Sequence, residues 1–383
     1  MKDLSIYFQP VETDKEFEDQ QLGSKILIHR PDQFPDLDKK GTALFYTPES
    51  RRGNCYESND EFRKQLYELY QGNNWTHDIY DLGTIMPGES IQDTLHAIQS
   101  VVFELVKNNI TPIIIGGSQD LTMGMYDAYA SLEQFVNLTT IDHKLDIGNS
   151  ENDISYDAWL SQLLLKKPCY LFNYSNIGAQ KHYIAPKTID LFNDLYFDIA
   201  RLGELKANPQ IAEPIMRNTD ILSFDLQSII STAWNAPYFE NPNGIDPYAA
   251  CTVMRYAGIS DKLSSVGLFN QDLRNTTNKS GASMIAQLIW YFNEGYAQRK
   301  GDFPIGSKKQ YKKYRVFLEE LNEEIVFCKS DKSGRWWMEV PYPAKNNSKF
   351  MRHQLVPCSY KVYEEAMEGD IPDLWWKTYQ KIS

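Results

Sequence analysis

Segments with a helical hydrophobic pattern alternate with short apolar runs from about residue 85 to residue 300, and this alternation constrains the fold more than any other feature. Ser90 and Asp93 form a capping-box pattern, after which apolar side chains recur every three or four positions as far as Leu105. The apolar run 110–115 that follows ends at a Gly-Gly pair and predicts a buried strand. Repeated helix–strand alternation predicts an α/β domain of three layers (αβα), with helices on both faces of a mostly parallel sheet.

The same patterns predict the other elements of this region. Strands are expected at residues 136–142, 169–172, 221–226 and 264–269. Helices are expected at residues 120–132, 157–165, 209–217 and 246–257, and from a cap at Ser280 to about residue 299. In open parallel sheets, binding sites lie outside the carboxyl ends of the strands, so the residues that follow each strand are the candidates for function.

The chain has 383 residues, and its last 83 differ in pattern from the rest. Strands at residues 314–321, 324–328 and 335–340, with a turn at 331–334, predict an antiparallel sheet. Short helices are expected after Ser359 and at Pro372. We therefore divide the chain into a main α/β domain at 1–300 and a C-terminal α+β extension at 301–383.

Four of the eight tryptophans lie in this extension: Trp336, Trp337, Trp375 and Trp376. Because aromatic side chains dominate buried contact area, we expect these four to anchor the extension on the main domain. The alternative is that they form a surface for a partner.

Composition excludes several classes of function. A net charge of −12 repels phosphate backbones and anionic membranes, so we expect neither nucleic-acid binding nor membrane binding. No apolar run approaches the roughly 20 residues of a membrane helix, and the N-terminus lacks a signal-peptide pattern. The five cysteines are scattered and form no CxxC pair. We expect a cytoplasmic protein.

Polar residues cluster at the ends of three predicted strands. These segments are Gly116-Gly117-Ser118-Gln119-Asp120, Asp142-His143-Lys144-Leu145-Asp146 and Ser223-Phe224-Asp225-Leu226-Gln227. If each segment stays extended, alternate side chains share one face, which groups Asp142 with Lys144 and Asp146 and groups Asp225 with Gln227. Gln119 ends a neighbouring strand, so we expect six polar side chains to converge in one cleft.

The order and spacing of these segments resemble the arginase/agmatinase/formimidoylglutamase family, the ureohydrolases, whose corresponding motifs hold two manganese ions. The resemblance covers most of residues 40–300. It implies an arginase-like fold, a homo-oligomer, and hydrolysis of C–N bonds in guanidino or formimino compounds.

The six metal-ligand positions implied by the resemblance are only half retained. Asp142, Asp146 and Asp225 keep the family's aspartates, whereas Gln119 and Lys144 replace histidines and Gln227 replaces an aspartate. The family's catalytic histidine has no evident counterpart. Its late Glu-x-Asn-Pro segment corresponds here to Leu268-Phe269-Asn270-Gln271.

These replacements predict a site without its two metal ions. Both imidazole ligands are lost, and an ammonium at Lys144 would repel a cation by several kcal/mol, since two unit charges about 4 Å apart repel by about 4 kcal/mol at an effective dielectric of 20. We expect Lys144 to pair with Asp142, Asp146 and Asp225 and to replace the metals, so no metal is expected. The alternative is that these three aspartates hold one manganese or magnesium ion.

His143 also lies among the acidic residues. Strand alternation directs its side chain away from Asp142 and Asp146, so we expect a packed or hydrogen-bonded histidine rather than a ligand.

Three functions remain open at this point. The first is a pseudoenzyme of the ureohydrolase fold that serves in binding, scaffolding or regulation. The second is an active, metal-dependent hydrolase with an altered site, similar to formimidoylglutamase or agmatinase. The third is a different enzyme that uses the acidic pocket with Lys144. The sequence identifies no ligand, substrate or protein partner.

Overall fold

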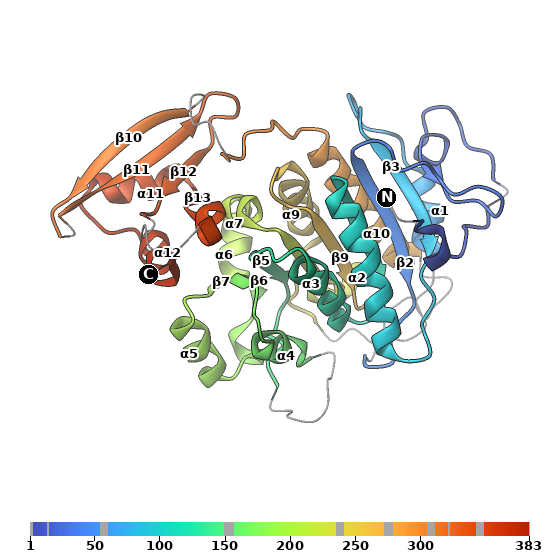
Figure 1. Ribbon diagram of the computed structural model, residues 1–383, viewed down its shortest axis with the longest axis horizontal. Coiled ribbons are helices and arrows are strands. Elements are labelled where there is room, and N and C mark those ends of the chain that lie inside the picture. The colour runs from blue at the N-terminus through green and yellow to red at the C-terminus, as the bar shows by residue number, and fades with distance from the viewer. Residues whose placement is uncertain are drawn as a thin grey trace.

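The computed structural model describes residues 3–13, 15–53, 60–148, 157–234, 241–271, 279–304, 311–320, 322–341 and 348–382. Its centre is a nine-stranded sheet in the order β1-β3-β2-β4-β9-β8-β5-β6-β7, in which all paired strands are parallel (Figure 1). The strands are β1 (Leu27–Ile28), β2 (Gly41–Thr47), β3 (Asp78–Thr84), β4 (Ile110–Gly116), β5 (Val136–Ile141), β6 (Leu171–Ala179), β7 (Asp198–Arg201), β8 (Ile221–Asp225) and β9 (Ser265–Phe269).

Helices cover both faces of this sheet. The α-helices of the main region are α1 (Glu61–Glu68), α2 (Ile91–Lys107), α3 (Thr122–Ser131), α4 (Trp159–Leu165), α5 (Pro186–Asp194), α6 (Leu202–Ala207), α7 (Ala212–Asn218), α8 (Ser231–Trp234), α9 (Pro247–Ile259) and α10 (Lys279–Tyr296). Two separate hydrophobic clusters follow from strand alternation: Ile113 and Ile115 of β4 pack with α1, α9 and α10, and Ile114 packs with α2, α3 and α4. The expected three-layer αβα architecture is confirmed.

Most predicted elements lie within a few residues of their observed bounds. Ser90 and Asp93 form the expected capping box, in which the Ser90 side chain accepts from the Asp93 amide and the Asp93 carboxylate accepts from the Ser90 amide. One predicted boundary was wrong: α10 already includes Lys279, so Ser280 lies inside the helix and is not its cap. The predicted strand at 169–172 begins later and runs on as the nine-residue β6.

The C-terminal extension forms a four-stranded antiparallel sheet in the order β10-β11-β12-β13, which lies beside the β7 end of the main sheet (Figure 1). Its elements are β10 (Tyr311–Leu318), β11 (Glu323–Ser330), β12 (Trp336–Glu339), β13 (Leu355–Cys358), α11 (Tyr360–Met367) and α12 (Asp373–Ile382). The sheet and its two helices enclose a hydrophobic cluster of their own, which Phe172 of β6 contacts. The division at residue 300 stays a prediction.

The four tryptophans of the extension have different roles. Trp336 and Trp375 are buried in the extension's own cluster, and Trp337 is buried against Arg217 of α7, whose guanidinium lies 4.8 Å from the ring centre. Trp376 is 43% exposed. Trp337 therefore packs its ring on the main region, and Trp336 contacts the same arginine, Arg217, through its carbonyl. None of the helices in the described part of the chain is both long and apolar enough to span a membrane.

Candidate functional site

The carboxyl ends of β4, β5 and β8 bring together four of the six predicted site residues. Gln119 opens a 3-10 turn after β4, Asp142 follows β5 directly, and Asp225 is the last residue of β8. All three side chains are buried, as is Asp146. The position agrees with the rule that sites of open parallel sheets form at the carboxyl ends of strands.

Hydrogen bonds join Gln119 to two of the carboxylates. Oriented to satisfy its neighbours, the amide nitrogen donates to Asp142 Oδ2 at 3.3 Å and to Asp146 Oδ2 at 3.2 Å, and the amide oxygen accepts from Ser223 Oγ at 3.2 Å. The backbone amide of Gln119 also donates to Asn270 Oδ1 at 3.1 Å. An uncharged donor thus occupies the position where the family resemblance places a histidine ligand.

Asp146 has a second fixed partner. The indole Nε1 of Trp159, in the first turn of α4, donates to Asp146 Oδ2 at 2.7 Å. This oxygen therefore accepts from both an indole and an amide, and the carboxylate is held at one side of the cluster.

His143 contradicts the expectation that it points away from the carboxylates. Its Nδ1 lies 3.2 Å from Asp142 Oδ1, and one ligand atom each from Asp142, His143 and Asp225 falls within 4.8 Å of the others. The reason is local: β5 ends at Ile141, so the alternation of an extended strand does not continue through residues 142–146. His143 is only 6% exposed, and the edge of its ring meets the ring of Tyr183.

Lys144 contradicts the expectation of a buried counter-ion. Among the described residues no carboxylate lies within 4.0 Å of its ammonium, which lies instead 6.0 Å from the ring centre of Tyr183. The side chain is half-buried, and its backbone amide donates to Asp142 Oδ1 at 2.9 Å. Because the chain turns after β5, Lys144 leaves the carboxylate side and His143 takes that position.

Gln227 contacts the cluster through its backbone. β8 ends at Asp225 and a 3-10 turn follows, so Asp225 and Gln227 do not alternate along one strand. Within the described part of the chain, Gln227 acts through its backbone: its amide donates to Asp225 Oδ1 at 2.8 Å, and its carbonyl accepts from Asn241 Nδ2 at 3.1 Å.

Two carboxyl groups of the cluster, Asp146 and Asp225, have raised pKa values. Burial, followed by the charge of Asp142, raises the pKa of Asp225 to about 7, and the charge of His143 acts in the opposite direction. Burial and the charges of Asp142 and Asp225 raise the pKa of Asp146 well above its usual range. Lys144 lowers the pKa of Asp146, but this is the smallest of the effects on that group. The three carboxylates therefore lack a full counter-charge.

The residues present fit one divalent ion. His143 Nδ1 and Asp142 Oδ1 are 3.2 Å apart, yet His143 Nδ1 is buried without a hydrogen-bond partner. Ligand atoms about 2.1 Å from a shared ion and at right angles to each other are about 3 Å apart, so this spacing suits two ligands directed at one ion. Asp225 supplies a third ligand, and imidazole with carboxylates suits manganese or a similar metal. The sequence-based alternative is one ion held by Asp142, Asp146 and Asp225. In the structure, His143 takes the place of Asp146 in that set of ligands.

The residues do not fit a bridged pair of ions. Gln119 has replaced one imidazole and its amide nitrogen is directed at the carboxylates, and Lys144 and Gln227 stand where the family resemblance implies a histidine and an aspartate. Among the described residues, three aspartates and one histidine leave too few anionic and imidazole ligands for two coordination shells.

Sequence reasoning missed several residues around the cluster. Trp159 and Tyr183 are separated from the motifs by many residues, and no pattern in the sequence marks them as neighbours of Asp146 and His143. Gln180 is similar: its backbone amide donates to the His143 carbonyl at 3.0 Å. Its position at the end of β6 was the only available signal, because strand ends in this fold are candidate positions.

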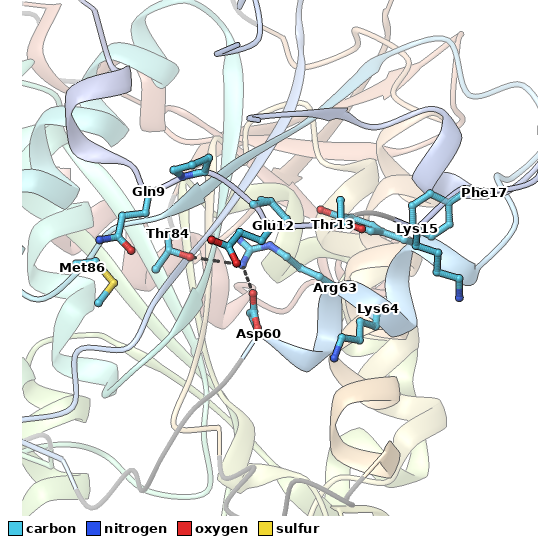
Figure 2. Close-up of a pocket in the computed structure, with 13 residues that line it drawn as sticks. Gln9, Glu12, Thr13, Lys15, Phe17, Asp60, Arg63, Lys64, Thr84 and Met86 are labelled. Atoms are coloured by element: carbon cyan, nitrogen blue, oxygen red, sulfur yellow. Dashed lines mark hydrogen bonds and ion pairs between the residues drawn. The ribbon is translucent and has the colours of Figure 1, made fainter. Parts of the chain in front are cut away.

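A cavity of about 620 Å³ lies away from this site, between the N-terminal segment, α1 and the end of β3 (Figure 2). Arg63 on its wall donates to Asp60 Oδ2 at 3.1 Å and to both oxygens of buried Asp81, at 2.8 and 3.1 Å. These carboxylates neutralise the guanidinium, and none of the six predicted site residues lines the cavity. We assign it no role in the chemistry of the cluster.

Comparison with known proteins identifies relatives of this arrangement. A model of the Arginase family matches residues 45–268, more than half of the chain. A formimidoylglutamase of Streptococcus gordonii is 23% identical over an alignment of 269 residues that covers 64% of this chain and 80% of that protein.

Solved structures show the same fold at low sequence identity. A formiminoglutamase of Trypanosoma cruzi, solved with Mn²⁺, has a TM-score of 0.64 at 17% identity and covers 74% of this chain and 100% of its own. The formimidoylglutamase of Bacillus subtilis has a TM-score of 0.64 at 15% identity over 76% of this chain and 96% of its own. An agmatine ureohydrolase of Thermoplasma volcanium has a TM-score of 0.58 at 15% identity, over 74% and 96%.

Proposed function

Because the chain belongs to the arginase family, the ureohydrolases, we propose that it is a member without two-metal hydrolysis that serves as a binding or regulatory protein. Its carboxylate cluster holds a single divalent cation through Asp142, His143 and Asp225. The observation that carries this proposal is the 3.2 Å approach of His143 Nδ1 to Asp142 Oδ1 without a hydrogen bond between them.

The loss of the second ion follows from Gln119. Its amide nitrogen donates to Asp142 and Asp146, so these carboxylate oxygens already have a donor where a second cation would need free ligands. Asp146 is further bound by the Trp159 indole. The hydrolysis that the family resemblance implies depends on the paired ions and on a catalytic histidine. The sequence supplies no evident counterpart for that histidine.

A hydrolase with one ion is the second candidate, and the same Asp142–His143–Asp225 group favours it. A divalent ion held there would supply Lewis-acid chemistry and lower the pKa of a bound water. Asp146, which is not one of the three ligands, has a pKa raised well above its usual range by burial and by the charges of Asp142 and Asp225, so it is the carboxyl group of the cluster that could hold a proton.

A turnover assay separates the two candidates. The full chain is incubated with manganese and agmatine, arginine or formiminoglutamate, and release of urea or formamide is followed. We expect no release above the level of an Asp225→Asn variant, because the second ion and the catalytic histidine are missing. Product formation that the wild type shows and Asp225→Asn lacks would support the hydrolase and contradict the pseudoenzyme.

A further inference from the structure

A second cavity, of about 230 Å³, lies at the carboxyl ends of β6 and β7. Three basic side chains line it: Lys181 follows β6, Arg201 ends β7, and Lys206 belongs to α6. No aspartate or glutamate is among the described residues of its lining. This concentration of positive charge contrasts with a chain whose net charge is −12.

The three basic side chains lack counter-charges. In the ranges that the structure describes, none of them has a carboxylate within 4.0 Å. The nearest acidic residue along the chain, Glu204, is engaged by the backbone amide of Arg201, which donates to its Oε2 at 2.7 Å. Lys206 Nζ donates to the neutral Asn243 Oδ1 at 3.0 Å. Like charges gathered around one small cavity repel one another, and a bound anion would relieve that repulsion.

Gln180 supplies an independent indication of a ligand. Its side chain lines the cavity and is only 4% exposed. Its Nε2 donates to Asn241 Oδ1 at 3.3 Å, but its Oε1 has no hydrogen-bond partner. A buried acceptor without a donor costs about 1–3 kcal/mol, so a ligand with a donor beside its anionic group would satisfy both features of the cavity.

We propose that this cavity binds the oxyanion group, a carboxylate or a phosphate, of a small metabolite. Ligand pockets for whole drug-sized molecules usually measure about 300–1,000 Å³, so a cavity of about 230 Å³ accommodates one anionic group rather than a complete nucleotide. Arg201 supplies a planar donor pair for the oxyanion, and Lys181 and Lys206 supply point charges.

Gln180, which lines the cavity, connects it to the carboxylate cluster. The Gln180 backbone amide donates to the His143 carbonyl, and Asn241 donates to the Gln227 carbonyl, two residues beyond Asp225. The anion site extends the proposed binding function by naming its ligand as an anionic small molecule. This assignment of the ligand rests on the proposed function. The anion site itself depends only on the basic residues and not on a metal.

Titration of the full chain with two probes tests the site. Inorganic phosphate and glutarate are titrated separately by calorimetry at low ionic strength, into protein from which metal was removed by a chelator that was then dialysed away. We expect saturable binding of one anion per chain, weakened about tenfold or more in Arg201→Gln and in Lys206→Gln, because each removes a charge-assisted hydrogen bond. Lys187→Gln is the matched control, since Lys187 is an exposed residue of the nearby α5.

Each outcome decides the proposal. Tighter binding of phosphate identifies a phosphate ligand and tighter binding of glutarate a carboxylate ligand, and both support the site when Lys187→Gln binds like the wild type. Absence of saturable binding, or equal weakening in Lys187→Gln and Arg201→Gln, overturns it. The chelator removes metal from this measurement, so its failure is distinguishable from failure of the single-cation proposal.

Discussion

At the scale of single residues, the exchange of His143 and Lys144 decides the character of the site. Both positions follow from the end of β5 at Ile141, which stops the alternation of side chains before the motif is complete. The sequence places an ammonium among the carboxylates, whereas the structure places an imidazole there. A shift of one residue therefore turns an expected ion pair into a candidate metal ligand.

Replacement of Lys144 by alanine tests this exchange. We expect Lys144→Ala to lower the free energy of unfolding by no more than about 1 kcal/mol, because the side chain loses only a partly exposed cation–π contact with Tyr183. Urea unfolding of the metal-free protein measures the change. A loss of about 3–5 kcal/mol, typical of a broken buried ion pair, would show that the lysine neutralises the carboxylates after all.

The carboxylate residues themselves could be predicted, but their surroundings could not. Asp142, Asp146, Asp225 and Gln119 were placed together because parallel strands end at one edge of a sheet. The contact of Trp159 with Asp146 depends on how α4 packs over the strand ends, which local pattern does not specify. The prediction of side-chain direction was wrong at the positions that follow a strand end, because side chains alternate between faces only along extended backbone.

At the scale of secondary-structure elements, α7 connects the main sheet with the extension. Arg217 of α7 is buried, and its Nη1 and Nη2 donate to the carbonyls of Trp336 and Cys358, each at 3.0 Å. A second contact joins the two regions: Nη1 of Arg352, in the extension, lies 2.7 Å from Oδ1 of buried Asp220 in the main region. These charge-assisted contacts join strands β12 and β13 to the edge of the main region.

Loss of Arg217 is expected to weaken this connection. Arg217→Ala removes two hydrogen bonds to carbonyls and the packing on Trp337, so we expect unfolding to cost about 3 kcal/mol less. Faster hydrogen exchange in β12 and β13 than in β4 would locate the effect. Arg315→Ala is the control, because its ion pair with Glu324 is exposed and contributes about 1 kcal/mol or less.

An equal loss of stability in Arg217→Ala and Arg315→Ala would contradict a connecting role for Arg217.

Elements with strong periodicity could be predicted, and short or mixed ones could not. The helix α2 and the strand β4 carry a cap and continuous apolar patterns, and both lie where expected. The strand β3 was missed because its residues Asp78 and Asp81 interrupt the apolar run, although Asp81 is buried through its pairing with Arg63. The strand β13, Leu-Val-Pro-Cys, was missed because it is short and contains proline.

At the scale of the whole molecule, buried charges make stability depend on pH. Burial lowers the pKa of Lys262 from its ordinary value of 10.5 to about 8, despite its approach to Asp220. Between these values the unfolded chain keeps a proton that the folded chain has lost, so the contribution of Lys262 to stability rises as the pH rises from about 8 to about 10.

A comparison of variants isolates the contribution of Lys262. We expect Lys262→Met to reduce the gain in melting temperature between pH 8 and about 10 relative to wild type, because the group with the lowered pKa is gone. Lys187→Met, at an exposed position, serves as the control and keeps the wild-type slope. An unchanged slope in Lys262→Met would mean that other groups produce the dependence.

We propose that this arginase-family chain binds one divalent cation, where the family resemblance implies two manganese ions. The direct measurement is the number of manganese ions bound per chain, by equilibrium dialysis with elemental analysis, for the wild type and for His143→Ala. We expect one ion per wild-type chain and a loss of that ion in His143→Ala, with His182→Ala as the control that retains it. Two ions per chain, or one ion that His143→Ala retains with unchanged affinity, would contradict the account.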